Sequence, residues 1–334
     1  MNMKNWLEGI RLEKRKRALP ILSFPCASLM GVTVRELVTD SKLQAKGMKL
    51  IADRYDTLAS VSIMDLSVEA EAFGAQTIYS TDEVPTVVGA LIKDLEDAEA
   101  LAVPEVGAGR TARYVEALGM AKAAITDRPT LAGVIGPFSL SGRLMDVSEA
   151  MIKCYDDPDT VHAVLEKATD FLIRYISAYK EVGADGVMMA EPLGGMLSPM
   201  LAEEFSEPYV KRIVDALQDD RFIIVYHNCG DNVLYMADSI ARTGAAAFHF
   251  GNSVKMTDML KMMPEDKLIM GNVDPARELK NGTPESIRKA VFDIMSEATR
   301  HDNFVISSGC DIPPSAPIEN IDAFFEAVNE FYEG

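Results

Sequence analysis

Seven short runs of β-branched, aromatic and other apolar residues recur along the chain at intervals of a few tens of residues. They occupy residues 61–66, 130–136, 183–191, 222–227, 245–251, 267–271 and 304–308. Apolar runs without polar alternation are typical of strands that are buried on both faces, as in a parallel sheet. This feature limits the fold, because consecutive parallel strands need a crossover between them, usually a helix.

The segments between the runs predict those helices. Helical patterns cover residues 35–55, 158–182 and 199–217, and residues 84–125 are helical with interruptions at Pro85 and Pro104. The alternation predicts an α/β fold, a TIM-type (β/α)8 barrel whose eighth strand lies near residues 77–79 or is irregular. We expect a single barrel domain over residues 1–334, with a helical N-terminal extension at residues 2–18.

The balance of charge excludes some classes of partner. Asp and Glu number 51 against 33 Lys and Arg, a formal net charge of −18, which argues against nucleic acid and anionic membrane surfaces as partners. The longest apolar runs reach about half of the ~20 residues that a membrane span needs. The 4 cysteines do not make a disulfide framework in a chain of this length. No signal peptide opens the sequence, so we expect a reducing, cytoplasmic setting.

The run at 222–227 ends in two residues that commonly bind metals. His227 and Cys229 stand two positions apart, just past the expected strand end, and Gly230 follows them. Side chains two positions apart emerge on the same side of an extended backbone, and a glycine lets the chain turn away without a Cβ clash. Cys310 lies at the equivalent point after the run at 304–308.

One histidine and two cysteines at strand ends fit a zinc site. Zinc binds imidazole nitrogen and thiolate sulfur, and a catalytic site keeps three protein ligands with the fourth position open. The alternative is a histidine satisfied within the core and two cysteines that pack as small apolar residues. Spacing alone does not decide between them, because the third ligand is remote in the sequence.

Other polar residues follow the expected strands at the same end of the barrel, where the chemistry of such folds gathers. They are Asp65, Glu191, Asn272 and Asp274. We expect Glu191 to face the barrel mouth; the alternative is a surface glutamate that merely precedes Pro192. His249 lies inside its run, which favours a place in the core or in a pocket wall.

Five stretches, residues 65–74, 136–138, 226–230, 271–275 and 308–320, together carry a family resemblance. With them the chain resembles the uroporphyrinogen decarboxylase superfamily over nearly its whole length, and within it the branch of methylcobamide:coenzyme M methyltransferases. The first and fourth stretches are shared across the superfamily, whereas the blocks at 226–230 and 308–320 are specific to the zinc methyltransferases. The resemblance implies that His227, Cys229 and Cys310 bind Zn²⁺.

The same resemblance implies a methyl transfer between a methylated corrinoid protein and a thiol acceptor such as coenzyme M. A zinc-bound thiolate attacks the methyl group of methylcobalamin, carried by the partner protein to the barrel mouth, and cobalt(I) leaves. Glu191 is the expected catalytic residue, filling the fourth position at rest or taking the thiol proton. We expect Asp65, Asn272 and Asp274 to bind the small-molecule substrate. A homodimer is compatible with this assignment.

Other functions stand as alternatives. The transfer can run in the other direction, so that an O-methyl or N-methyl compound is demethylated onto the corrinoid protein. A decarboxylase of the superfamily needs an arginine-rich N-terminal motif for its polycarboxylate substrate, and residues 22–31 carry no arginine. A non-catalytic corrinoid-binding module predicts a degraded metal set. Arg143 and Lys255 are the candidate cations for the sulfonate of coenzyme M.

Overall fold

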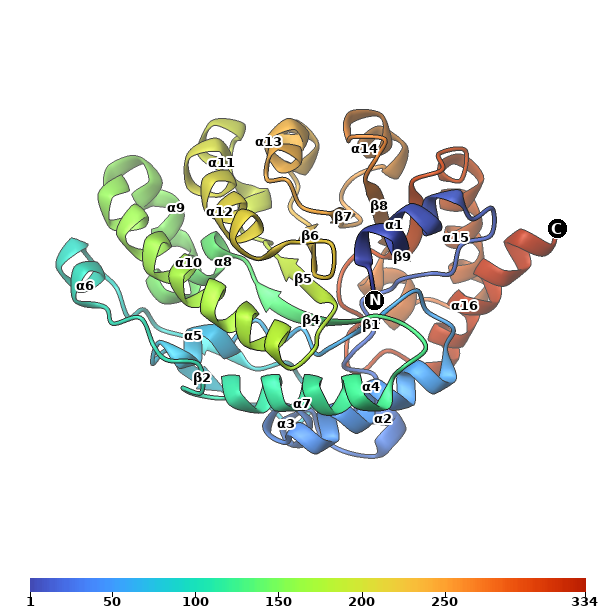
Figure 1. The fold of residues 1–334 in the computed structure, drawn as a ribbon, viewed down its shortest axis with the longest axis horizontal. Coiled ribbons are helices and arrows are strands. Elements are labelled where there is room, and N and C mark those ends of the chain that lie inside the picture. Colours follow the sequence, from blue (N-terminus) through green and yellow to red (C-terminus); the bar gives the residue numbers. More distant parts are fainter.

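A computed structural model describes residues 1–334, and its centre is a curled sheet of seven parallel strands (Figure 1). In spatial order the strands are β1 Ser60–Val61, β4 Thr130–Ile135, β5 Gly186–Ala190, β6 Ile223–Asn228, β7 Ala247–Phe250, β8 Leu268–Val273 and β9 Phe304–Ser308. Each strand pairs with the next in chain order within this sheet. All seven apolar runs therefore form barrel strands, and the expected α/β barrel class is confirmed.

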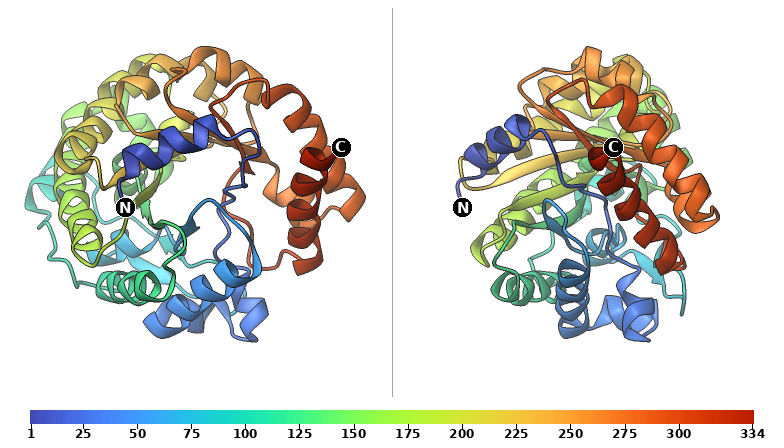
Figure 2. Two further views of the ribbon diagram at one scale, coloured as in Figure 1. Left: turned by 45° about the vertical axis from the view of Figure 1, so that its right-hand side comes forward. Right: turned by 90° about the vertical axis from the view of Figure 1, so that its right-hand side faces the viewer.

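Helices surround the sheet, as the views in Figure 2 show. The N-terminal part holds α1 Met3–Leu12, α2 Cys26–Met30, α3 Val34–Thr39 and α4 Ser41–Arg54. The crossovers hold α5 Val68–Ala72, α6 Leu95–Ala100, α7 Thr111–Ala124, α8 Pro137–Met145, α9 Val147–Asp156, α10 Pro158–Glu181, α11 Pro199–Phe205, α12 Glu207–Leu217, α13 Ala237–Arg242, α14 Met256–Met262 and α15 Pro284–Ala298, and α16 Ile318–Glu333 follows β9. Short turns η1 Gly194–Met196, η2 Val233–Met236 and η3 Pro275–Lys280 follow β5, β6 and β8.

An extended segment without a strand of its own fills the eighth position of the barrel. The Leu19 N–H donates to the Ile306 carbonyl of β9 (3.1 Å), and the Leu58 N–H donates to the Ala18 carbonyl (3.0 Å). The segment around residues 18–22 thus lies between β9 and the chain that enters β1. Pro20 has no N–H, which limits the regular ladder here.

Of the two alternatives for the eighth strand, an irregular segment is confirmed and a strand near residues 77–79 is wrong. These residues fall in β2 Gln76–Ile78, which pairs antiparallel with β3 Thr86–Val88 in a separate two-stranded sheet. Ile78 is 54% exposed, so this hairpin does not have the burial of a barrel strand. The hairpin also means that residues 84–94 are not helical, and the predicted helix over 84–125 consists only of α6 and α7.

The alternation of side chains along the strands divides the core into two layers. Met188, Ala190, Ile223 and Val225 belong to an inner cluster of 17 buried residues, whereas their neighbours in the chain belong to an outer cluster of 85 between sheet and helices. Met3 joins the inner cluster, and its N–H donates to the Asp220 carbonyl (2.7 Å) just before β6. The helix α1 therefore covers the amino-terminal end of the barrel and leaves the carboxyl ends of the strands free for a site.

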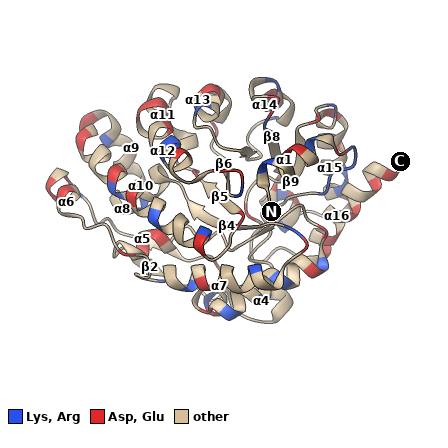
Figure 3. Ribbon diagram, in the orientation of Figure 1, with Lys and Arg blue, Asp and Glu red and all other residues tan.

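Charged residues lie mostly on the outer helices and loops (Figure 3). None of the helices combines the length and the apolar character that crossing a membrane requires.

Candidate metal centre

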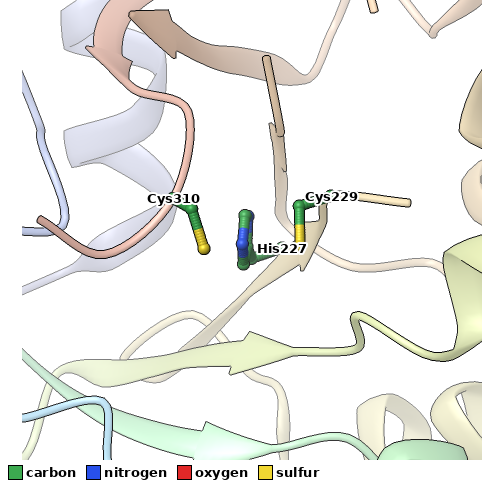
Figure 4. Close-up of side chains that lie close together, drawn as sticks. All are labelled: His227, Cys229 and Cys310. Carbon is green, nitrogen blue, oxygen red and sulfur yellow. The ribbon is translucent and has the colours of Figure 1, made fainter. Parts of the chain in front are cut away.

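Three potential zinc ligands meet at the carboxyl ends of two strands. His227 lies in β6, Cys229 directly follows β6, and Cys310 stands two residues past β9. Their ligand atoms all lie within 4.8 Å of one another, and the side chains converge in Figure 4. His227 is 1% exposed, and the two cysteines are half-buried. The predicted set of His227, Cys229 and Cys310 is therefore brought together by the fold.

The register of the strands explains why these side chains point inward. His227 pairs with Ala190 of β5 and with His249 of β7, and it lies two positions beyond Val225 of the inner cluster. It therefore belongs to the next inward-facing layer, at the mouth of the barrel. His227 is 1% exposed and Val225, two positions earlier on the same strand face, is 0% exposed.

Two glycines permit the close approach of the loops beside Cys229. A Cβ on Gly251 would lie 2.5 Å from the Cys229 Cβ, and one on Gly230 would lie 2.1 Å from the Gly195 carbonyl carbon. Gly230 does not have a positive φ, so its role differs from the expected turn. It is required because the loops after β5 and β6 touch through their backbones.

A chain of hydrogen bonds determines the tautomer of His227. Ser307 donates from Oγ to the Leu19 carbonyl (2.6 Å), so its oxygen accepts from His249 Nε2 (2.7 Å). His249 Nδ1 is then an acceptor for His227 Nδ1–H (2.7 Å). The Nε2 atom of His227 consequently carries a lone pair, as a neutral histidine ligand requires.

The donor set fits zinc. His227 Nε2 is buried and has no hydrogen-bond partner within the chain, a state that costs about 1–3 kcal/mol for a buried polar group. It lies beside two sulfur atoms, and nitrogen with sulfur is the ligand set that zinc prefers. A hydrogen bond from Cys310 lowers the pKa of the Cys229 thiol; the same bond, together with burial, raises the pKa of Cys310 to about 12.

We expect His249→Phe to weaken zinc binding by about 10- to 100-fold, the usual effect of removing the partner that orients a histidine ligand. Phenylalanine fills the space but cannot accept from His227 Nδ1–H, so the ligand loses its orientation. Competition with a chromophoric chelator measures the affinity. His162→Phe is the matched control, because His162 also bonds through Nδ1, to the Tyr209 hydroxyl (2.7 Å), on the helical layer. Equal zinc affinity in the two variants would contradict the orienting role.

Glu191 does not face the metal site, contrary to expectation. Its carboxylate accepts from the backbone N–H groups of Phe138 (3.0 Å) and Ser139 (2.6 Å) at the start of α8. The reason is alternation: Ala190 faces the barrel interior, so Glu191 points into the layer between sheet and helices. It is 0% exposed, so it is not a surface glutamate either. Burial raises the pKa of Glu191 to about 7.

Asp65 is held in a buried ion pair. Its carboxylate accepts from Arg110 (2.5 Å), from the Tyr114 hydroxyl (2.8 Å) and from the Ser67 hydroxyl (2.6 Å). The Arg110 guanidinium also binds Glu71 (2.6 Å). The geometry therefore gives Asp65 a place in the wall behind the loop after β1, and direct contact with substrate stays a prediction.

Asn272 and Asp274 hold loops. The Asn272 amide donates to the carbonyls of Gly251 (2.8 Å) and Val254 (2.7 Å). Asp274 accepts from the backbone N–H groups of Ala276 (2.9 Å) and Arg277 (2.8 Å). Both residues line a cavity of about 380 Å³, and their role in substrate binding also stays a prediction.

Comparison with known proteins identifies the family. Residues 18–331 match the model of a protein family that is described as Uroporphyrinogen decarboxylase (URO-D). The chain belongs to this family. A URO-D relative from Hydrogenovibrio crunogenus, named uroporphyrinogen decarboxylase, is 28% identical over 290 residues, which cover 83% of this chain and 80% of the relative. A methylcobamide:CoM methyltransferase from Methanosarcina acetivorans is 28% identical over 275 residues, 80% of this chain and 78% of the relative.

Two solved structures have a similar fold. A methyltransferase from Methanosarcina mazei superimposes with a TM-score of 0.85 at 23% identity, covering 99% of this chain and 98% of that chain. A B12-independent methionine synthase from Shewanella sp. W3-18-1 gives a TM-score of 0.61 at 12% identity, covering 96% of each chain. The sequence relatives of the chain are named both as decarboxylases and as methyltransferases, and the site residues must distinguish the two.

The expected place of His249 in the core or a pocket wall is confirmed, because it is 0% exposed within β7. Sequence reasoning missed its partner Ser307, which interrupts the otherwise apolar start of β9, and that polar interruption was the available signal. Their contact depends on the register of β6, β7 and β9, which the sequence does not display. Nothing in the sequence indicated a role for Arg110, because it lies at the start of α7 and contacts Asp65, which is 45 residues away in the chain, only in the folded protein.

Proposed function

We propose that this URO-D family protein is a zinc-dependent methyltransferase that moves a methyl group between a corrinoid protein and a thiol. One observation carries the proposal: His227 Nε2 is buried and unpartnered, and it lies with two cysteine sulfurs inside a 4.8 Å cluster. The similarity to the methylcobamide:CoM methyltransferase supports it. Zinc bound there would lower the pKa of an incoming thiol, so that a nucleophilic thiolate forms near neutral pH.

The residues of the chain supply the zinc ligands and hold them in place. Cys229 and Cys310 offer two sulfur ligands from different strand ends, so the site becomes complete only when the barrel is folded. The His249 and Ser307 bonds hold the imidazole of His227 in one tautomer. Three ligands leave a fourth position for a thiol. Glu191 points away from that position, so a proton released by the thiol leaves by another route.

The mouth of the barrel offers a surface for a protein partner. Asn232 joins the loops after β5 and β6 by donating to the Met196 carbonyl (3.1 Å). The same loops and α11 expose large apolar side chains, with Met196 54%, Met200 64% and Tyr235 74% exposed. Exposed apolar groups beside a site favour contact with another protein, and a corrinoid carrier must bring its methyl group to this end.

The sequence around the site argues against decarboxylation. Residues 22–31 carry no arginine or lysine, although Ser23 reaches Asp311 next to Cys310 (3.1 Å). The buried Arg110 is already paired with Asp65 and Glu71. A tetrapyrrole with many carboxylates needs several free cations, and this part of the chain does not supply them.

Purified protein should hold about one zinc per chain, as a single Cys₂His site requires. With methylcobalamin and a panel of thiols, its absorption spectrum should change to that of demethylated cobalamin. Uroporphyrinogen serves as the competing substrate and should stay unchanged. Coproporphyrinogen formation would establish a decarboxylase, and methylation of a reduced corrinoid by methoxylated aromatics or methylamines would establish the opposite direction of transfer.

A further inference from the structure

A cavity lies at the end of the barrel opposite to the metal centre, where α1 crosses the barrel (Figure 2). One wall is α1, and the others are the turns that lead into β6, β7 and β8. Its volume of about 330 Å³ is at the lower end of the range for small-molecule sites, roughly 300–1,000 Å³. The chemistry of such barrels gathers at the carboxyl ends of the strands, so this cavity is suited to binding without catalysis.

Arg11 is the cation of the α1 wall. It is half-buried, and its Nε atom is buried without a hydrogen-bond partner. The next arginines along the chain differ, because Arg15 pairs with Glu333 (3.6 Å) and Arg17 pairs with Asp56 (3.1 Å). A buried N–H donor without an acceptor is unfavourable. An acceptor bound in the cavity would remove that cost.

The opposite wall supplies a second cation without a partner. Lys267 directly precedes β8 and is half-buried. Its backbone carbonyl accepts from the Asn303 amide (2.9 Å), which holds this turn in place. Of all the charged groups in the lining, only Asp219 has an ion-pair partner, Lys180 (2.6 Å), which lies outside the cavity. The ammonium of Lys267 therefore remains available to a ligand.

The lining carries charges of both signs. Its cations are Lys4, Arg11 and Lys267, and its carboxylates are Glu8, Asp219, Asp220 and Asp266. All the carboxylates are exposed, whereas two of the cations are half-buried. Carboxylates around the opening disfavour a ligand with several negative charges, and the net charge of −18 on the whole chain does the same. A ligand with one carboxylate and one ammonium group matches both sets.

We propose that this cavity binds an apolar α-amino acid of about the size of leucine. The planar guanidinium of Arg11 offers two parallel hydrogen bonds to the carboxylate of the ligand, and Lys267 adds a second cation. The ammonium group faces the exposed carboxylates. Leu7, Ile223 and Ala246 provide an apolar wall for the side chain. This site goes beyond the proposed methyl transfer and does not depend on it.

The ligand would fasten α1 to the barrel. The backbone N–H groups of Met3 (2.7 Å) and Lys4 (3.4 Å) already donate to the Asp220 carbonyl, so the start of α1 is tied to the turn before β6. A ligand between Arg11 and Lys267 would tie the end of α1 to the turn before β8. Because a ligand that binds only the folded state stabilises it, L-leucine should raise the melting temperature in a concentration-dependent way.

Analogues of leucine that lack one charge test the assignment. 4-Methylpentanoate lacks the ammonium group, and 3-methylbutylamine lacks the carboxylate. L-Leucine should bind the full-length protein about 10- to 100-fold more tightly than either analogue, as expected for the loss of a charge-assisted hydrogen bond. Isothermal titration calorimetry measures the three affinities. Absence of leucine binding, or equal binding of leucine and 4-methylpentanoate, would overturn the proposal.

Variants of the two cations locate the site. Arg11→Gln should weaken the binding of leucine and 4-methylpentanoate by about 10- to 100-fold and leave 3-methylbutylamine unchanged, and Arg11→Lys should restore part of the loss. Lys267→Gln should act in the same direction. Arg17→Gln is the matched control, because Arg17 lies on the same segment but pairs with Asp56 (3.1 Å). Wild-type leucine affinity in both Arg11→Gln and Lys267→Gln, or an equal loss in Arg17→Gln, would contradict the site.

A last control excludes the metal centre, because an amino acid can also bind zinc through its amine and carboxylate. Cys310→Ala removes a proposed zinc ligand and should bind leucine as tightly as the wild type does. Loss of leucine binding in this variant, with wild-type binding in Arg11→Gln, would place the amino acid at the metal centre and overturn the proposal. Zinc content and methyl transfer should be unchanged in Arg11→Gln, so the two functions are tested separately.

Discussion

Replacing Cys310 with alanine is expected to abolish methyl transfer and to lower zinc affinity by about 10²- to 10³-fold. A structural zinc site contributes on the order of 10–16 kcal/mol through four ligands, so the loss of one ligand removes roughly a quarter of that. Cys310 belongs to the cluster in which all ligand atoms lie within 4.8 Å. Elemental analysis after dialysis against a weak chelator and the spectral assay with methylcobalamin measure the two effects.

The fold should survive this substitution. Cys310 stands past the end of β9 and is half-buried, so alanine leaves no large cavity in the core. Cys154→Ala is the matched control, because Cys154 is a buried free thiol on α9 that donates to the Ala150 carbonyl (3.2 Å). It should keep zinc and activity. A Cys310→Ala protein that keeps stoichiometric zinc, or one whose circular dichroism spectrum collapses, would contradict a metal role and favour two cysteines that merely pack.

The sequence was sufficient to predict the barrel and the meeting of the three candidate metal ligands for a simple physical reason. Strand ends are marked by small and polar residues, and parallel strands place all their carboxyl ends at one edge. His227, Cys229 and Cys310 therefore had to meet at that edge once the strands were recognised. The prediction that these residues meet did not depend on which way a single side chain points, because His227 and Cys229 are two positions apart and share a face of the strand.

The direction of Glu191 could not be predicted in the same way. A strand buried on both faces has no polar alternation to show which residues point inward. The pairing of Ala190 with His227 shows which residues of β5 point into the barrel. That pairing joins two separate strands, so it cannot be read from β5 alone. The helix dipole and free N–H groups at the start of α8 then provide the carboxylate with partners outside the barrel.

The segment that fills the irregular eighth position was not predicted, because it has no strand pattern. Pro20 interrupts the region, and its contacts are to β9, almost the whole chain away. This same segment provides the Leu19 carbonyl that ends the hydrogen-bond chain from His227. The tautomer of the candidate ligand His227 thus depends on the contact between the two ends of the barrel, which no local pattern reveals.

The largest expected effect on stability comes from Arg110. The Arg110→Met variant should lose about 3–5 kcal/mol, the usual cost when one partner of a buried ion pair is removed. The Arg110 side chain is 4% exposed and holds Asp65, which is 0% exposed. Methionine fills much of the space but leaves the Asp65 and Glu71 carboxylates without their cation. Chemical denaturation measures the free energy of unfolding.

Two further variants identify the cause of that loss. Arg113→Met, three residues along α7, removes an exposed arginine that bonds only the Thr39 carbonyl, so it should cost less than about 0.5 kcal/mol, as is usual for a surface position.

The triple variant Arg110→Met, Asp65→Asn, Glu71→Gln should regain most of the lost stability, because no uncompensated charge remains. Failure of the triple variant to recover would mean that the shape of Arg110, and not its charge, holds the network.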